Sequence, residues 1–173
     1  MTVRKRTVIG AVALVVSGGL AVTPLASATA SQGYIGGAGS PTNDWAREGV
    51  LSTGSHAHSN ATALWQAVLW ADGVHESNGT PFDYADIDCR FGPNTKAATK
   101  NWQKMNQLTQ DGAVGPHTFG TADGQLRKDG GNVVKYIGRA HSVWLMRVSG
   151  KYQIRVKKSA GYRVAYYNKA TVC

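Results

Sequence analysis

The apolar residues between positions 61 and 72 repeat with the period of an α-helix. They are Leu64, Trp65, Val68 and Leu69. Because these positions recur at intervals of four residues, they share one face of a helix. Ser59 or Asn60 can cap the first turn with a side-chain oxygen, and Gly73 suits the helix end. The pattern predicts a first helix over residues 61–72 with one buried face.

Two further helices are predicted downstream. After Thr95 the apolar side chains again share one helical face, and lysines recur every four residues on the other. The apolar positions are Ala97, Ala98, Trp102 and Met105, and the lysines are Lys96, Lys100 and Lys104. A third, weaker helix is expected from Thr118 to about Arg127, since Gly120 and Gly124 each cost roughly 1 kcal/mol relative to Ala.

Toward the C-terminus the pattern changes to the period-two alternation of β-strands. Residues 144–148, 152–156 and 162–166 alternate between apolar and polar side chains, and glycine-containing turns separate them. Residues 133–137 are a further candidate strand. The alternation puts Trp, Tyr, Ile and Val side chains, including Trp144, on one apolar face. The opposite face carries Arg147, Arg155, Lys157 and Arg163. An antiparallel meander of three strands needs its apolar face covered, so we expect it to pack on the helices.

One short phrase occurs twice in the middle of the chain. Residues 88–95 and residues 111–118 both read D-x-x-(F/V)-G-P-x-T, 23 positions apart. Each copy predicts a tight turn, a buried apolar side chain, and a Gly-Pro step that suits the first turn of a helix. We call this repeat the doubled motif, and we expect its two turns and helices to pack together as one small module.

The doubled motif and its surroundings resemble a known family. Residues 65–73 read W-Q-x-x-L-x-x-x-G, residues 88–103 read D-x-x-F-G-P-x-T-x-x-A-x-x-x-W-Q, and residues 108–119 read L-x-x-D-G-x-V-G-P-x-T-F. This pattern is similar to the three-helix bacterial peptidoglycan-binding domain over residues 61–126. The resemblance implies a helical module that docks on cell-wall peptidoglycan. We therefore expect an α+β fold, in which a C-terminal antiparallel β-meander packs on a three-helix peptidoglycan-binding-like module.

The sequence departs from the family pattern at three places. Cys89 stands where the first copy usually has glycine, Gln107 replaces another glycine, and the loop over residues 74–87 is longer than usual. A cysteine gives up the freedom of glycine at positive φ. We therefore expect the turn at Cys89 to be rebuilt around a disulfide.

The N-terminus has the pattern of a secretory signal peptide. Arg4, Lys5 and Arg6 form a charged region, residues 8–16 form an apolar run, and small residues at 28–30 suit a cleavage site. The apolar run is too short to span a bilayer comfortably. A signal peptide over residues 1–30 is therefore favoured over a membrane anchor.

Three segments follow the predicted signal peptide. Residues 31–55 are a Gly/Ser-rich linker or arm, which Trp45 and Leu51 can dock on the body. Residues 56–129 form the peptidoglycan-binding-like helical module. Residues 130–173 form the basic, β-rich C-terminal segment.

Charge is distributed unevenly between these segments. The chain has 19 basic and 10 acidic residues, a net charge of +9. Residues 31–129 hold seven basic and ten acidic residues, a net charge of −3, whereas residues 130–173 hold nine basic residues and no acid. This asymmetry predicts that the basic segment has an anionic partner or lies on the acidic half.

Cys89 and Cys173 are the two cysteines, and an even count in an exported chain predicts a disulfide between them.

Aromatic and polar side chains near the predicted turns are candidates for ligand contact. We expect contact with sugar or stem peptide from Trp70, Tyr84, Arg90 and Asn94. His56 and His58 form an H-x-H pair, but no further Cys or His lies nearby at metal-ligand spacing, and two ligands hold zinc poorly. We expect neither a metal nor another cofactor.

These patterns predict a secreted, non-catalytic and monomeric protein at the cell wall, where it binds peptidoglycan or another wall glycopolymer. The four basic residues of the polar sheet face, Arg147, Arg155, Lys157 and Arg163, would attract wall polyanions.

One alternative is a small wall hydrolase or its targeting subunit. Catalysis is disfavoured because the five histidines show no ligand pattern and both cysteines fit a disulfide. Another alternative is a cationic secreted protein that binds nucleic acid or membranes. Export disfavours nucleic acid, and the mature chain contains no apolar run long enough to span a membrane.

Overall fold

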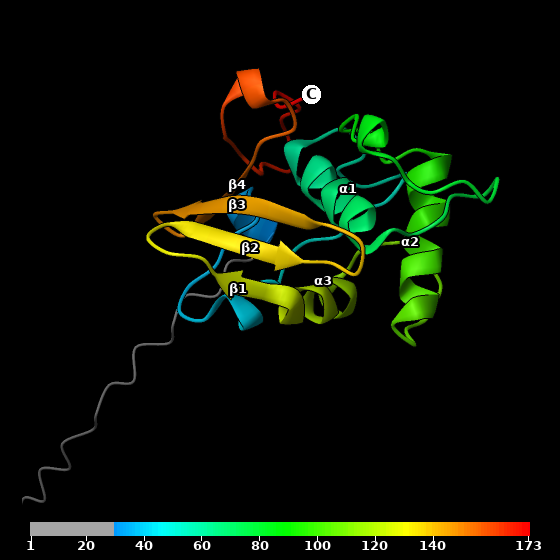
Figure 1. The fold of residues 1–173 in the computed structure, drawn as a ribbon, viewed down its shortest axis with the longest axis horizontal. Coiled ribbons are helices and arrows are strands. Elements are labelled where there is room, and N and C mark those ends of the chain that lie inside the picture. Colours follow the sequence, from blue (N-terminus) through cyan, green and yellow to red (C-terminus); the bar gives the residue numbers. More distant parts are fainter. Residues whose placement is uncertain (1–29) are drawn as a thin grey trace, which may run out of the picture.

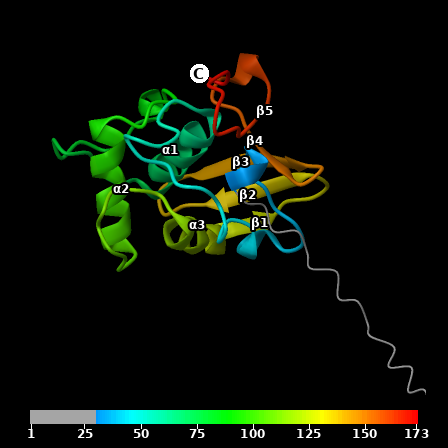
Figure 2. The same cartoon turned by 180° about the vertical axis from the view of Figure 1, so that it is seen from behind.

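The computed structural model describes residues 30–173 as three helices and one antiparallel sheet (Figures 1 and 2). The helices are α1 (Asn60–Asp72), α2 (Pro93–Met105) and α3 (Pro116–Ala122). The strands are β1 (Leu126–Lys128), β2 (Val133–Ile137), β3 (Ser142–Val148), β4 (Lys151–Ile154) and β5 (Arg163–Val164). The predicted α+β fold is confirmed. Residues 1–29, nearly all of the predicted signal peptide, lie outside the described residues.

Helix α1 is the centre of the fold. It lies between α2 on one side and the sheet on the other (Figures 1 and 2). Because both sides are covered, every residue of α1 except Trp70 is buried, not only the predicted apolar face. The Ser59 hydroxyl accepts a hydrogen bond from the Thr62 N–H at 3.0 Å and caps the first turn. Gly73 ends the helix at a φ of 62°.

Helix α2 buries a single face and keeps its lysines in solvent. The buried positions are Thr95, Ala98, Thr99, Trp102 and Gln103. Met105, which the sequence pattern put on the apolar face, is 41% exposed because it is the last residue of the helix. Trp102 packs edge-on against Trp65 of α1, with ring centroids 5.1 Å apart, and so joins the two helices.

The two copies of the doubled motif fold into the same hydrogen-bonded turn, each around a buried glutamine. In the first copy, Gln66 Nε2 donates to Asp88 Oδ1 at 2.8 Å and to Thr95 Oγ1 at 3.0 Å. Its Oε1 accepts from the Cys89 N–H at 3.0 Å. In the second copy, Gln103 Nε2 donates to Asp111 Oδ1 at 2.7 Å and to Thr118 Oγ1 at 3.2 Å. Its Oε1 accepts from the Gly112 N–H at 2.9 Å. The conspicuous polar residues of the motif therefore hold the turns together.

Cys89 keeps the backbone conformation of the glycine that it replaces. Its φ is 66°, against 72° for Gly112 at the same place in the second copy. The expected rebuilding of this turn is therefore wrong: the glutamine contacts hold Cys89 in the left-handed region that favours glycine. Cys89 is disulfide-bonded to Cys173, with their Cα atoms 6.0 Å apart. The C-terminus is thus fastened to the first turn of the doubled motif.

The sheet is a continuous meander with the strand order β1-β2-β3-β4-β5. It has five strands where the alternation predicted three with one further candidate. The third helix ends at Ala122, not near Arg127, and a short 3₁₀ turn at Asp123–Gln125 leads directly into β1. Leu126, the first residue of β1, is fully buried and pairs with Tyr136. Burial of Leu126 in the sheet therefore prevails over the weak helical pattern.

The inner and outer faces of β3 are the reverse of the prediction. Leu145 is 1% exposed and points into the core, whereas Trp144 is 49% exposed on the outer face. Strand β4 has the predicted orientation, with Tyr152 and Ile154 buried. Arg147 lies opposite Tyr152 in the register and so also belongs to the inner face. Strand β3 carries large apolar residues on both faces, which is why alternation alone assigned it wrongly.

Residues 31–55 pack on the body as an irregular arm. Ile35, Trp45 and Leu51 of this arm are fully buried. Trp45 lies edge-on to Tyr152 of β4, with ring centroids 5.3 Å apart, and Leu51 forms backbone hydrogen bonds with Val114 of the second motif copy. The arm therefore bridges the sheet and the helices, and one hydrophobic core runs through all three.

Candidate ligand-binding sites

A groove of about 340 Å³ runs along the first copy of the doubled motif. We call it the motif groove. Arg90 and Asn94, two of the predicted ligand-contacting residues, line it and are exposed. Asp86 and Asp88 line the same groove. One oxygen of Asp88 accepts from Gln66 and from the Arg90 N–H, so the turn below the groove is rigid.

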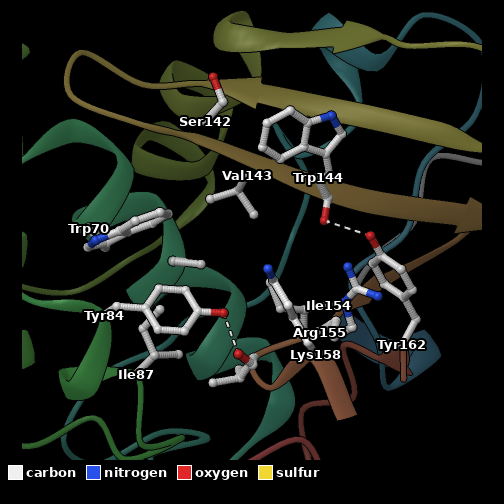
Figure 3. Close-up of a pocket in the computed structure, with 12 residues that line it drawn as sticks. Trp70, Tyr84, Ile87, Ser142, Val143, Trp144, Ile154, Arg155, Lys158 and Tyr162 are labelled. Atoms are coloured by element: carbon white, nitrogen blue, oxygen red, sulfur yellow. Dashed lines mark hydrogen bonds between the residues drawn. The ribbon is translucent and has the colours of Figure 1, made fainter. Parts of the chain in front are cut away.

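A second cavity, of about 350 Å³, lies where the helical module meets the sheet (Figure 3). We call it the junction cavity. Trp70 of α1 and Tyr84 stand on one side, and Arg155 and Tyr162 on the other (Figure 3). Val143 of β3 lies between the two sides (Figure 3). The four predicted ligand-contacting residues therefore divide between two sites: Trp70 and Tyr84 do not lie with Arg90 and Asn94.

The aromatic wall of the junction cavity is held in place by its own contacts. Trp70 and Tyr84 pack edge-on with ring centroids 5.0 Å apart. His141 stacks on Trp70 at 4.4 Å, with ring planes 8° apart. The Tyr84 hydroxyl donates to the carbonyl of Val156, and burial raises the pKa of Tyr84 above its usual value. These rings thus form a fixed apolar wall, and stacking by His141 takes up one face of Trp70.

The four residues predicted to bind polyanions have different environments. Arg147 is on the inner face, where its guanidinium forms a 2.5 Å salt bridge with the buried Asp44 and donates to the carbonyl of Gly39. Arg147 is therefore committed to the N-terminal arm, which corrects its assignment to an open cationic face. The other three residues are exposed: Arg155, Lys157 and Arg163. Of these, only Arg155 lines the junction cavity.

The structure adds residues that the sequence pattern missed. Trp144 is half exposed, with the Lys135 ammonium 4.9 Å from its ring centroid and its indole N–H donating to Asp129 at 3.0 Å. Lys158 and Tyr162 line the junction cavity, and the Arg155 guanidinium lies 4.9 Å from the ring centroid of Tyr162. The alternation of residues 162–166 placed Tyr162 in a strand, but no sequence signal joined it to Trp70 across the chain.

Three carboxylates are buried where the N-terminal arm meets the body: Asp44 and Glu48 of the arm, and Asp123 of the body. Burial raises the pKa of Glu48 to about 7, although hydrogen bonds from the Gly36 N–H and the Tyr167 hydroxyl oppose the rise. Burial likewise raises the pKa of Asp123 to about 6. Asp123 accepts from the Trp45 N–H at 2.8 Å. With Asp44, which accepts from Tyr152 of β4, they tie the arm to the sheet, to Tyr167 and to the 3₁₀ turn that follows α3. None of the three lines the motif groove or the junction cavity.

Two general features of the described residues bear on the site. Over residues 30–173, no group of three or more His, Cys, Asp or Glu side chains is arranged to hold a metal ion. In the same range no helix is long and apolar enough to cross a membrane.

Comparison with known proteins identifies one part of the chain. Residues 77–121 match the model of a family described as "Putative peptidoglycan binding domain". No curated protein and no solved structure matches the chain. The matched residues contain α2, both copies of the doubled motif and every residue of the motif groove, but neither α1 nor the sheet. The resemblance of the doubled motif to this family is thus confirmed over residues 77–121.

Proposed function

We propose that this protein is a secreted, non-catalytic cell-wall protein that holds peptidoglycan in its motif groove. The observation that carries the proposal is that all residues lining this groove lie within the matched segment, residues 77–121. Two exposed residues with suitable chemistry, Arg90 and Asn94, line the groove at the turn that Gln66 holds rigid. A rigid site loses less entropy when it binds a ligand.

The groove offers complementary hydrogen-bonding groups. The Arg90 guanidinium can bind a carboxylate or a carbonyl oxygen, and Asn94 both donates and accepts. Asp86 and Asp88 can accept from sugar hydroxyls or amide N–H groups. Peptidoglycan combines sugar hydroxyls, amides and carboxylates, so this mixture of side chains suits a segment of the polymer in which glycan and peptide meet.

The basic C-terminal segment supports attachment to the wall at longer range. Its nine basic residues have no acidic residue among them, and Arg155, Lys157 and Arg163 are exposed. Wall polyanions would be attracted to this segment, and the attraction would weaken as salt screens it. The N-terminal pattern of charged, apolar and small residues supports export to the compartment in which the wall is found.

Co-sedimentation with insoluble peptidoglycan tests the proposal. Purified walls are used with and without their accessory anionic polymers. The wild-type protein should sediment with both preparations, and the double variant Arg90→Ala/Asn94→Ala should lose most binding to the stripped polymer. Lys100→Ala/Lys104→Ala is the control on the exposed face of α2 and should bind as the wild type does.

The proposal would be wrong if the wild-type protein stayed in the supernatant with both preparations at low salt. Release of soluble fragments from washed walls would overturn the non-catalytic part. Unchanged binding by Arg90→Ala/Asn94→Ala would move the contact to another face.

A further inference from the structure

The junction cavity exists only because the sheet packs on the helical module. Ala67 and Trp70 come from α1, Tyr84 and Ile87 from the loop before the first motif copy, and the remaining lining residues from the C-terminal segment. Of the lining residues, only Tyr84 and Ile87 lie within the segment that matches the peptidoglycan-binding family. The cavity is therefore a feature of this chain's own combination of module and sheet.

The walls of the junction cavity are apolar, and its charged groups are all positive. Trp70, Val143 and Ile154 supply apolar surface, whereas Arg155 and Lys158 supply two exposed cations. No acidic residue lines the cavity. The one salt bridge among residues 30–173 joins Arg147 to Asp44, so Arg155 and Lys158 have no carboxylate partner there.

Size and charge together define the occupant. A volume of about 350 Å³ is at the lower end of the range for small-molecule sites, roughly 300–1,000 Å³. A long apolar chain would not fit, and a bare inorganic anion would leave the aromatic wall uncovered. A small apolar group that carries one negative charge satisfies both features, because it covers the wall and pairs with the two cations that have no carboxylate partner.

We propose that the junction cavity binds the free carboxylate end of a short peptide with small apolar side chains, as found at the ends of peptidoglycan stem peptides. This inference rests on the proposed function for the class of polymer, and it assigns a second contact on that polymer. The terminal carboxylate pairs with Arg155 and Lys158, and the small side chains lie against Trp70 and Tyr84. The motif groove and the junction cavity then hold different parts of the same wall fragment.

A titration with a defined peptide tests the assignment. The probe is N-acetyl-D-alanyl-D-alanine, and the matched control ligand is its C-terminal amide, which lacks the charge. Binding is followed by calorimetry and by NMR shifts of the Trp70 indole and the Val143 methyl groups. The acid should shift these signals and bind at least about tenfold more tightly than the amide, because charge-assisted hydrogen bonds are roughly twice as strong as neutral ones.

A pair of charge-matched variants locates the contact. Arg155→Gln/Lys158→Gln should weaken binding of the acid at least about tenfold and leave the amide unaffected. Lys157→Gln/Arg163→Gln removes the same charge from the same segment, but these residues do not line the cavity. This control variant should change the affinity for the acid by less than about twofold relative to the wild-type protein.

Three outcomes would overturn the inference: equal binding of acid and amide, no shift of the Trp70 signal, or equal loss in both double variants. The first two need no variant, so they stand even if one variant folds poorly. Failure here is distinguishable from failure of the proposed function. A protein that sediments with peptidoglycan but ignores the peptide acid loses only the cavity assignment, whereas one that binds the acid but not the wall loses the proposed function.

Discussion

The buried carboxylate of Glu48 should make this protein less stable at mildly alkaline pH than at mildly acidic pH. Glu48 is 2% exposed and holds the N-terminal arm through the Gly36 N–H and the Tyr167 hydroxyl. Burial raises its pKa from 4.5 to about 7. Below pH 4.5 the carboxyl group is protonated in both the folded and the unfolded state, so its contribution to stability is then fully present.

The size of the effect follows from the displaced pKa. As the pH rises from 4.5 to 7, the unfolded chain releases the Glu48 proton while the folded chain retains it, and the free energy of unfolding falls. At 1.36 kcal/mol per pKa unit, the loss approaches about 3 kcal/mol once the pH exceeds 7. Asp123, with its pKa raised from 3.8 to about 6, adds a loss in the same direction at lower pH.

Guanidinium unfolding followed by tryptophan fluorescence at pH 5 and pH 8 measures this difference. Glu48→Gln keeps the shape of the side chain but does not ionise, so it should remove most of the Glu48 share of the decline. Asp129→Asn, at an exposed carboxylate, is the isosteric control and should keep the wild-type pH dependence. The reasoning is refuted if the wild-type protein is equally or more stable at pH 8, or if Glu48→Gln declines as steeply.

Three further changes test the fold by the same unfolding assay. Gln103→Ala leaves several buried polar groups of the second motif copy without partners and should cost about 2–4 kcal/mol, whereas Lys104→Ala on the exposed face should change stability by less than about 0.5 kcal/mol. Cys173→Ser removes the cross-link to Cys89 and should destabilise by about 4 kcal/mol on the chain-entropy estimate, a difference that should vanish when both proteins are reduced. Arg147→Met leaves the buried Asp44 without its cation and should cost about 3 kcal/mol or more; a loss below about 1 kcal/mol would show that this pair does not anchor the arm.

The helical half of the fold could be predicted because its signals are local. Each copy of the doubled motif forms its turn within eight residues. The glutamine that completes each turn, Gln66 or Gln103, comes directly after a tryptophan in the sequence. Helix caps such as Ser59 and Gly73 also act within one turn. The turn keeps its conformation even with Cys89 in place of the family's glycine, because the backbone N–H of Cys89 is held by Gln66 and not by the cysteine side chain.

The sheet was predicted less well because tertiary contacts decide it. Leu126 follows a weak helical pattern, yet pairing with Tyr136 makes it the start of β1. The faces of β3 depend on Arg147, whose partner Asp44 lies 103 residues earlier in the chain, on the N-terminal arm. Alternation cannot reveal such a partner.

The two candidate sites also differ in how far the sequence could predict them. Arg90 and Asn94 lie four residues apart on one motif copy, so sequence reasoning could place them together, and the structure finds both in one groove. The junction cavity joins Trp70 to Arg155 and Lys158, more than 80 positions downstream. Only the packing of the sheet on α1 brings these residues together.

The most direct test of the central claim is an NMR map of the isotopically labelled protein titrated with a soluble fragment of peptidoglycan that retains both sugar and stem peptide. Wall binding through the motif groove predicts saturable shifts at Arg90, Asn94 and the Asp88 turn, while the exposed lysine face of α2 stays unchanged. Shifts that avoid the motif groove, or no saturable shift at millimolar fragment, would contradict the account.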